Sequence, residues 1–480
     1  MQKKYNVLSL FAILVVQGCT QLNTTDLVGS AEQTNITEPK NIIMVVSDGM
    51  GPAYTTAYRN FADDPATPAV ENVVFDDIFV GNASTYPAPV SGYVTDSAAA
   101  ATALATGVKS YNGAIGVDVN KLPVESVLQR AKRLGMRTGV AVTSQVNHAT
   151  PAAYIAHNES RKNYDAIADS YFDDRLNGKF VADVMLGGGT QFFEREDRDL
   201  VAEFIDNGYE YVDTYNKLAT LPAGSNVLGL FAPVGLPAAL DDTRHHRLSY
   251  LTKNAIKHLE NDNGFFLLVE ASQVDWAGHS NDIASAMAEM DDLAATMKYL
   301  KQYVAAHPDT LVVLTADHST GGLSIAADGK YVWEPQYIQQ MKASVAMVAH
   351  RIVDSSDPIG LVEDQFGFTL SDDEKAQVTA IATMDDSKNR TAGLKTLLDK
   401  RTNTGWTTSG HTGVDVEVFA FGAGYEAFAG QIDNTDIAKT FFKYLEDNKA
   451  NRNATEQDAV EESKDADDVC DFKSQMRCQS

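Results

Sequence analysis

Short apolar runs that alternate with helical patterns constrain the fold of this chain more than any other feature. These runs are continuous, rich in Val, Ile, Leu and Phe, and cover residues 42–46, 138–143, 184–186, 265–269, 311–314 and 418–421. Strands buried on both faces of a parallel sheet show this pattern, because helices cover both faces. Helical patterns lie between the runs, at residues 124–134, 247–260 and 282–306. The β-α-β-α order therefore predicts an α/β fold with a central, largely parallel β-sheet sandwiched by helices.

Two segments depart from this pattern. Residues 326–404 contain polar helical segments and no strong strand, so we expect a cap or crown region inserted into a main domain that spans residues 41–445. Residues 446–480 are strongly acidic and are expected to form a solvated tail.

The N-terminus has the features of an export signal over residues 1–18. Two lysines precede an apolar core, VLSLFAILVV, that is too short to span a bilayer. The following Gln17-Gly18-Cys19 resembles a bacterial lipobox, which would make Cys19 a lipid-bearing mature N-terminus. Ordinary secretion with cleavage nearby is the alternative. Residues 19–40 are polar and are expected to form a tether, so the protein would be exported, either to the periplasm or as an outer-membrane or cell-surface lipoprotein.

The remaining cysteines, Cys470 and Cys478, lie close together near the C-terminus. In an oxidising compartment they could pair, but their spacing leaves this open. Neither cysteine lies among candidate metal ligands, so we do not expect a thiolate metal site.

The charge of the chain limits its partners. With 39 basic and 65 acidic residues the formal net charge is −26, which argues against a nucleic-acid-binding surface. An enzyme with this charge that acts on anions needs local positive charge, for instance from bound metal ions.

An alanine-rich run provides a candidate nucleophile. Residues 94–116 read VTDSAAAATALATGVKSYNGAIG, and Ala98–Ala105 should form a helix because alanine is the strongest helix former. Ser97 would lie at or just inside the first turn, where free N–H groups and the helix dipole favour an anion such as phosphate. The alternative is that Ser97 is only an N-cap.

Carboxylates and imidazoles follow several of the predicted strands. The residues are Asp48, His148, Glu270, Asp275, His279, Asp317 and His318, with Thr150 beside His148. Open α/β sheets bind ligands at the carboxyl ends of their strands. Oxygen and imidazole ligands without thiolates are typical of zinc and magnesium.

Six segments then identify a resemblance. VSDGMG, VTDSAAAATALATG, HATPAAYIAHNESR, FFLLVEASQVDWAGH, TADHSTGG and SGHTG occur in this order between residues 41 and 445. With these motifs the chain resembles the alkaline phosphatases. The resemblance implies an α/β phosphatase domain that hydrolyses phosphate monoesters through a covalent phosphoserine, with two zinc ions and one magnesium ion.

The resemblance also implies residue roles. Ser97 matches the nucleophile, Arg161 the arginine that clamps phosphate, and Asp96 the carboxylate that orients this arginine. The implied metal ligands are Asp275, His279 and His411 for the first zinc, Asp48, Asp317 and His318 for the second, and Asp48, Thr150 and Glu270 for magnesium.

Two positions depart from the best-known bacterial pattern of the family. His148 stands where that pattern has an aspartate, and Trp276 where it has a lysine. Exchanging a carboxylate for an imidazole near the third site should weaken its hold on magnesium. The alternative is that His148 is only a peripheral hydrogen-bonding residue.

Other functions remain open at this point. A relative within the same superfamily could act on phosphodiesters or sulfates, and a lipoprotein could bind metal or phosphate without catalysis. Members of the family are commonly dimers, so a homodimer is a further expectation. His245 and His246 match no family motif and are expected on the surface.

Overall fold

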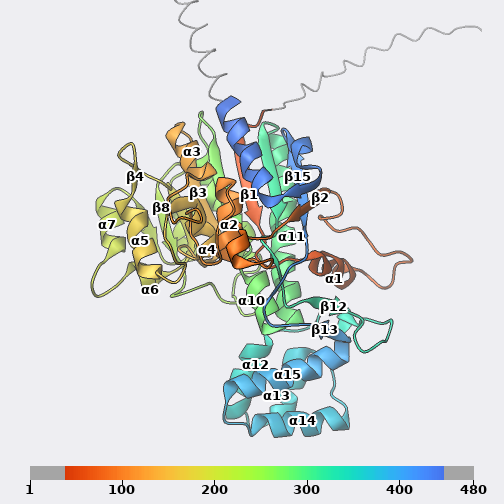
Figure 1. Cartoon of the computed structure of the whole chain (residues 1–480). Helices are drawn as coiled ribbons and strands as arrows, with labels where there is room; N and C mark the ends of the chain where they lie inside the picture. The colour runs from red at the N-terminus through yellow and green to blue at the C-terminus, as the bar shows by residue number, and fades with distance from the viewer. Residues whose placement is uncertain (1–37, 448–480) are drawn as a thin grey trace, which may run out of the picture. The chain divides into compact units, whose positions relative to one another are not determined.

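A ten-stranded sheet runs through the part of the chain that the computed structural model describes, residues 38–447 (Figure 1). In spatial order its strands are β16 (Gly430–Asp433), β2 (Phe79–Ser84), β15 (Val416–Gly422), β10 (Thr310–Thr315), β1 (Asn41–Val46), β9 (Phe265–Glu270), β3 (Arg137–Gln145), β6 (Val184–Gly188), β8 (Val227–Leu230) and β7 (Glu210–Val212). All neighbouring pairs are parallel except those that β15 makes with β10 and β2. The predicted largely parallel α/β sheet is therefore confirmed.

The export signal, Cys19, the tether up to residue 37, Cys470, Cys478 and nearly all of the acidic tail lie outside the described residues. Within residues 38–447 no helix is both long and apolar enough to cross a membrane.

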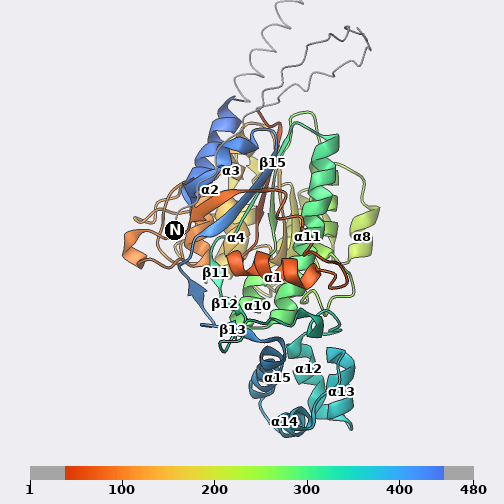
Figure 2. The same ribbon diagram turned by 90° about the vertical axis from the view of Figure 1, so that its right-hand side faces the viewer.

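Helices cover both faces of the sheet. On one side lie α2 (Ser97–Thr106), α3 (Val127–Arg133) and α4 (Ala149–Ile155), and on the other lies α11 (Ile283–Ala306), as Figure 2 shows. Every residue of β1, β9 and β10 is buried. Each fully buried Val, Leu or Ile contributes about 1.5–3 kcal/mol, which explains why continuous apolar runs mark these central strands.

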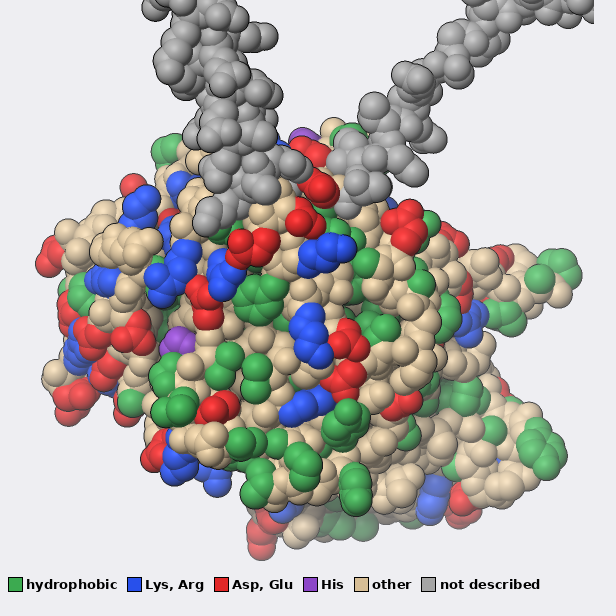
Figure 3. All heavy atoms as spheres, turned by 45° about the horizontal axis from the view of Figure 1, so that its top comes forward, with side chains coloured by type: hydrophobic (Ala, Val, Ile, Leu, Met, Phe, Trp, Pro, Cys, Tyr) green, Lys and Arg blue, Asp and Glu red, His purple; other side chains and the backbone are tan. Residues whose placement is uncertain are grey.

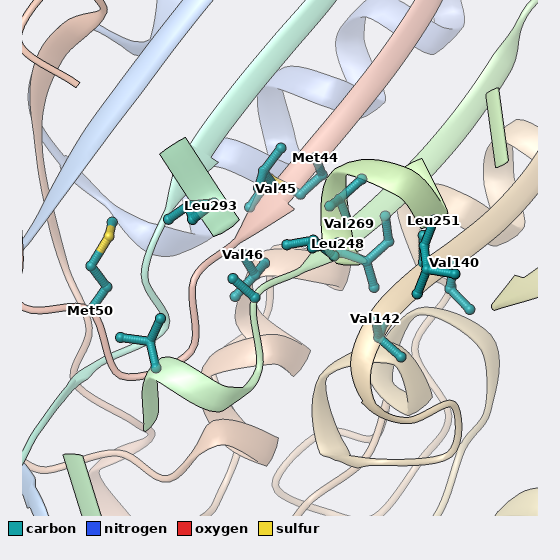
Figure 4. Packing of buried hydrophobic residues seen from close by; sticks show 14 of the residues in the cluster. Met44, Val45, Val46, Met50, Val140, Val142, Leu248, Leu251, Val269 and Leu293 are labelled. Carbon is teal, nitrogen blue, oxygen red and sulfur yellow. The ribbon is translucent and has the colours of Figure 1, made fainter. Parts of the chain in front are cut away.

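The packing between sheet and helices is seen closely in Figure 4. Leu248 and Leu251 of α9 (Arg247–Leu259) lie with Leu293 of α11 among the valines of the central strands. All three leucines are at most 1% exposed. The predicted helices 247–260 and 282–306 thus form one buried layer.

Helix α3 begins later than its pattern predicts. Ser126 forms a capping box, in which its hydroxyl accepts from the Gln129 N–H and the Gln129 side chain accepts from the Ser126 N–H. This reciprocal cap satisfies two free donors and starts the helix at Val127.

Four helices lie between β12 (Leu323–Ile325) and β13 (Thr404–Trp406), which pair with each other. They are α12 (Val345–Arg351), α13 (Pro358–Phe366), α14 (Asp372–Ala382) and α15 (Ser387–Thr402). Figures 1 and 2 show them as a group beside the β12–β13 ribbon. At the start of α12, the backbone N–H of Ser344 donates to the carboxylate of Asp241, and the backbone N–H of Val345 donates to the carboxylate of Asp282.

Further α-helices and strands lie between these elements. The helices are α1 (Pro52–Ala62), α5 (Tyr164–Asp173), α6 (Thr190–Phe193), α7 (Leu200–Asp206), α8 (Tyr215–Thr220) and α10 (Gln273–Ser280), and the strands are β4 (Arg175–Leu176), β5 (Lys179–Phe180), β11 (Ser319–Thr320) and β14 (His411–Thr412). A last helix covers residues 434–447.

The face drawn in Figure 3 carries Lys and Arg side chains interspersed with Asp and Glu side chains. The described residues on this face therefore present mixed charge.

Candidate active site

The predicted site residues gather at one edge of the sheet. Asp48 follows β1, Asp317 and His318 follow β10, and Glu270 is the last residue of β9. The strands β10, β1 and β9 are parallel neighbours, so their carboxyl ends meet at the same edge. His148 follows β3, the next strand along, and is the N-cap residue of α4.

Ser97 is the first residue of α2. The N-cap is Asp96, whose Oδ1 accepts from the Ala99 N–H at 3.0 Å, so the alternative that Ser97 is the cap is wrong. The Ser97 hydroxyl is buried and its Oγ lies 3.1 Å from Nε2 of His318. This places the hydroxyl beside the histidine and carboxylates at the ends of β1 and β10.

Asp275, His279 and His411 form a first candidate metal group, with one ligand atom of each residue within 4.8 Å of the others. His279 donates from Nδ1 to the Ser409 carbonyl at 2.6 Å, and His411 donates from Nδ1 to the Thr95 carbonyl at 2.9 Å. Their Nε2 atoms, 3.2 Å apart, are thereby left as acceptors. Metal-binding histidines are typically held in this way, because the bond at one nitrogen fixes the lone pair on the other.

Asp48, Asp317 and His318 form a second candidate group, which is completely buried. Asp317 uses Oδ1 to accept from the N–H groups of Gly49 and His318, which leaves its Oδ2 free. Oδ2 lies 3.2 Å from Nε2 of His318.

Thr320 connects these two groups. The Thr320 hydroxyl donates to Oδ1 of Asp275 at 2.5 Å. The oxygen of this hydroxyl also lies 3.2 Å from Nδ1 of His318. Because the hydroxyl proton points to the carboxylate, Nδ1 of His318 must be the donor to Thr320. Nε2 of His318 is therefore the acceptor that faces Asp48 and Ser97.

Asp48, His148 and Glu270 form a third group that shares Asp48 with the second. The Arg161 guanidinium donates to Nε2 of His148 at 3.2 Å, and the His148 ring packs edge-on against Trp276. Burial, with the charge of Arg161 as a second cause, lowers the pKa of His148 to about 3. His148 is thus neutral, and one of its ring nitrogens lies within 4.8 Å of a carboxylate oxygen of Asp48 and of Glu270.

Several buried oxygens of the second and third groups have no hydrogen-bond partner among the described residues. They are both carboxylate oxygens of Asp48, Oδ2 of Asp317, Oε1 of Glu270 and the Thr150 hydroxyl. Burial raises the pKa of Asp48 well above its ordinary value, with the carboxylates of Asp317, Asp275 and Glu270 as further causes. Buried polar groups are nearly always satisfied, so the donor set fits divalent cations held by oxygen and imidazole.

Arg161 lies over the start of α2. Its guanidinium donates to Oδ2 of Asp96 at 3.1 Å, and the other oxygen of Asp96 accepts from the Gly113 N–H. Asn112 fixes the same turn, because its side chain accepts from the Asp96 N–H and donates to the Val94 carbonyl. The serine and the arginine are therefore held together by one hydrogen-bonded loop.

Comparison with known proteins decides the family. The family model for alkaline phosphatase matches residues 39–446. The chain belongs to the alkaline phosphatase family.

Individual alkaline phosphatases are similar over most of their length. Alkaline phosphatase 3 of Bacillus subtilis (strain 168) is 46% identical over 419 residues, which cover 86% of this chain and 90% of that protein. The crystal structure of a cold-active alkaline phosphatase from the psychrophile Shewanella sp. is 51% identical, with a TM-score of 0.80 over 84% of this chain and 99% of that one. A variant of the alkaline phosphatase from the Antarctic bacterium TAB5, with a histidine replaced by aspartate, has Mg bound in its M3 site; it is 26% identical, with a TM-score of 0.63 over 86% of this chain and 99% of that one.

The sequence did not predict a role for three residues in this alkaline phosphatase site. Thr320 lies within the TADHSTGG motif and Asn112 within YNG, but only their hydrogen bonds show their connections. Gly235 is the third, because a Cβ there would lie 2.3 Å from the ring of Trp276. No local pattern marks that close approach, since the two residues come from different segments.

Proposed function

We propose that this chain is a metal-dependent phosphomonoesterase in which Ser97 forms a covalent phosphoserine. The observation that supports this most directly is the position of the Ser97 hydroxyl, 3.1 Å from Nε2 of His318 and on the first turn of α2. Phosphate monoesters are the substrates that the family implies.

Each of the first two groups would hold one cation, and the third cation would lie at Asp48 and Glu270 with Thr150 in place of His148 as a ligand. Zinc would be held by Asp275, His279 and His411 and by Asp48, Asp317 and His318, and magnesium by Asp48, Thr150 and Glu270. When bound, such cations supply Lewis-acid activation of the serine hydroxyl and of water and stabilise the leaving oxygen.

The residues of the chain position the reactants. The first turn of α2 directs its free N–H groups and the positive end of its dipole toward the phosphoryl group. Arg161 can bind two non-bridging oxygens with its planar fork, and Asp96 holds that fork in place. Positioning and charge neutralisation are what phosphoryl transfer mainly requires.

The reaction proceeds in two displacements. Ser97 loses its proton and attacks phosphorus, the ester P–O bond breaks, and the alcohol leaves with a proton. Water then attacks the phosphoserine, which releases inorganic phosphate and restores the hydroxyl.

The experiment that tests this is Ser97→Ala, assayed with p-nitrophenyl phosphate. Turnover should fall by several orders of magnitude while the metal content is unchanged, because the hydroxyl is the nucleophile and none of the metal groups includes this residue. Radiolabelled phosphate trapped at low pH should map to Ser97 in the parent enzyme. Label on another residue would refute the assignment.

Parallel assays separate the alternative functions. Bis-p-nitrophenyl phosphate and p-nitrophenyl sulfate report a diesterase or a sulfatase, and EDTA reports metal dependence. If zinc and magnesium are supplied and none of the three substrates is hydrolysed, only a binding protein remains.

We infer further that the third site holds magnesium weakly. A neutral His148 beside Asp48 and Glu270 contributes no negative charge. The TAB5 relative, which has Mg in its M3 site when a histidine is replaced by aspartate, supports this reading.

The proposal extends to the ends and the assembly of the protein. Residues 1–18 would direct export, Cys19 would carry lipid if the lipobox is used, and the mature protein would act outside the cytoplasm, in the periplasm or at the cell surface, as a homodimer. The mass of the mature N-terminal peptide and the molar mass in solution test these points.

A further inference from the structure

A pocket of about 510 Å³ opens beyond the carboxyl ends of β7 and β8. Its walls include Tyr215 after β7, Phe231 after β8, and Arg244 just before α9. The strand order β3-β6-β8-β7 places it two to three strands from His148, which is about 10–15 Å at ordinary strand spacing. None of the candidate active-site residues lines it.

Arg244 is the distinctive residue of this pocket. Its guanidinium lies 4.0 Å from the ring centre of Tyr250 and 5.1 Å from that of Tyr215. Among the described residues its side chain has no hydrogen-bond acceptor and no carboxylate partner, and its Nε is buried without a partner. In a chain with 65 acidic and 39 basic residues, an arginine held by two rings and paired with no acid is a free positive charge.

The two rings are themselves fixed. The Tyr250 hydroxyl donates to the Tyr215 carbonyl at 2.7 Å, and the Tyr215 hydroxyl donates to Asp242 at 3.1 Å. Tyr215 also stacks on Phe231, with ring centres 5.0 Å apart and an angle of 28° between the planes. The guanidinium is thus largely pre-organised, which lowers the entropy that a ligand must overcome.

The nearby acidic groups have partners other than the Arg244 guanidinium. Asp213, which also lines the pocket, pairs with Lys217 at 2.8 Å. Asp242 accepts from Tyr215 and lies 3.8 Å from the buried Arg247. No carboxylate lies within ion-pair distance of the Arg244 guanidinium among the described residues, so its N–H groups remain available to a ligand.

The shape of the pocket selects among anions. Its volume exceeds that of a single oxyanion, and Tyr215 and Phe231 offer an aromatic wall next to the charge. A planar guanidinium binds a carboxylate or a phosphoryl group with two parallel hydrogen bonds. An aromatic wall beside it favours a ligand that carries a flat ring.

We propose that this pocket is a second ligand site, which binds a planar organic molecule through its oxyanion on Arg244 and its ring against Tyr215 and Phe231. Aromatic carboxylates and aryl phosphates belong to this class. The site is independent of the proposed catalytic function, because it shares no residue with the metal groups.

The test uses benzoate as a non-hydrolysable probe on the full-length, metal-loaded protein, with binding measured by saturation-transfer NMR and calorimetry. Arg244→Met should weaken benzoate binding about tenfold or more, because it removes a charged hydrogen-bonding partner. Arg244→Lys, which keeps the charge but not the fork, should give an intermediate loss. Acetate should bind more weakly than benzoate, since it has no ring.

Two control variants locate the site. Arg351→Met, at an exposed arginine of α12, should leave binding unchanged, and so should Arg161→Met, which alters the catalytic groove. Thermal unfolding of each variant reports whether it is folded. Benzoate binding that persists in folded Arg244→Met, that disappears in Arg161→Met, or that is undetectable at millimolar concentration would overturn the proposal.

Discussion

At the scale of single residues, the site depends on side chains that orient other side chains. Thr320 is the clearest case, because one hydroxyl bonds a carboxylate of the first metal group and a histidine of the second. The motif TADHSTGG predicts that Asp317 and His318 lie in the site, but the partner of a hydroxyl depends on the register of β11 against the rest of the fold. The sequence therefore predicts the candidate metal ligands but not the hydrogen bonds that orient them.

Replacing Thr320 with valine tests this connection. Thr320→Val keeps the shape but removes the donor to Asp275 and the acceptor for His318, so zinc should be held about 10–100-fold more weakly. Zinc content after dialysis against a graded chelator series measures the effect. Thr320→Ser retains the hydroxyl and should behave like the parent; equal losses in both variants would contradict a role for the hydroxyl.

A substitution at His148 should strengthen metal binding rather than weaken it. His148→Asp adds a carboxylate beside Asp48 and Glu270, so the third site should keep magnesium through mild chelation that depletes it in the parent protein. Magnesium analysis by mass spectrometry before and after EDTA measures the difference. Full magnesium retention in the parent after chelation that removes zinc would show that the weak-site hypothesis is wrong.

At the scale of elements, sequence predicts six strands of the central sheet and misses the others, including the short buried strand β8. All six predicted runs are strands, because continuous apolar residues are needed where helices cover both faces. β7 and β16 are short edge strands with exposed residues, so no apolar run marks them. The antiparallel direction of β15 also escapes prediction, since its apolar run is the same in either direction.

Asp399 of α15 gives a prediction about stability and pH. Burial raises the pKa of its carboxyl to about 7, while the Trp406 indole donates to it at 3.2 Å. Between pH 4 and 7 the unfolded chain releases a proton that the folded chain keeps, so this group lowers stability as pH rises and the loss is complete above pH 7.

Asp399→Asn should remove that loss. Asparagine keeps an acceptor for Trp406 but carries no charge, so the variant should gain about 1–3 kcal/mol over the parent at pH 8 and little at pH 4, after allowance for partial exposure. Denaturant unfolding at the two pH values measures the difference. Asp385→Asn, at an exposed carboxylate just before α15, is the control; an equal gain in that variant would show that the effect comes from net charge.

At the scale of the whole molecule, the candidate metal groups join segments that are far apart in sequence. Asp48, Glu270 and Asp317 come from the ends of three central strands, and His411 comes from the segment after the four inserted helices. Six family motifs in order allow the sequence to predict this assembly. The resemblance also predicts His148 near the third site, but how close its ring lies to Asp48 and Glu270 depends on how α4 packs at the sheet edge.

Removing metal should therefore destabilise the molecule as a whole. Without cations, unpaired buried carboxylates at the ends of β1, β9 and β10 repel each other, so EDTA should lower the midpoint of thermal unfolding by several degrees. Calorimetry with and without EDTA measures the shift, and added zinc should reverse it. If EDTA removes the metals but the midpoint of thermal unfolding does not change, the assignment of these carboxylates as metal ligands is contradicted.

The pairing of β12 with β13 has a consequence for how this architecture can vary. Ile325 and Thr404 face each other across the ribbon, so the chain leaves the main body and returns to it at the same point. A segment of another length between these two positions could keep this ribbon, but it would have to replace the contacts that Ser344 and Val345 make with Asp241 and Asp282. In this chain the inserted helices can thus differ in length without a change in the direction of the strands that carry the site.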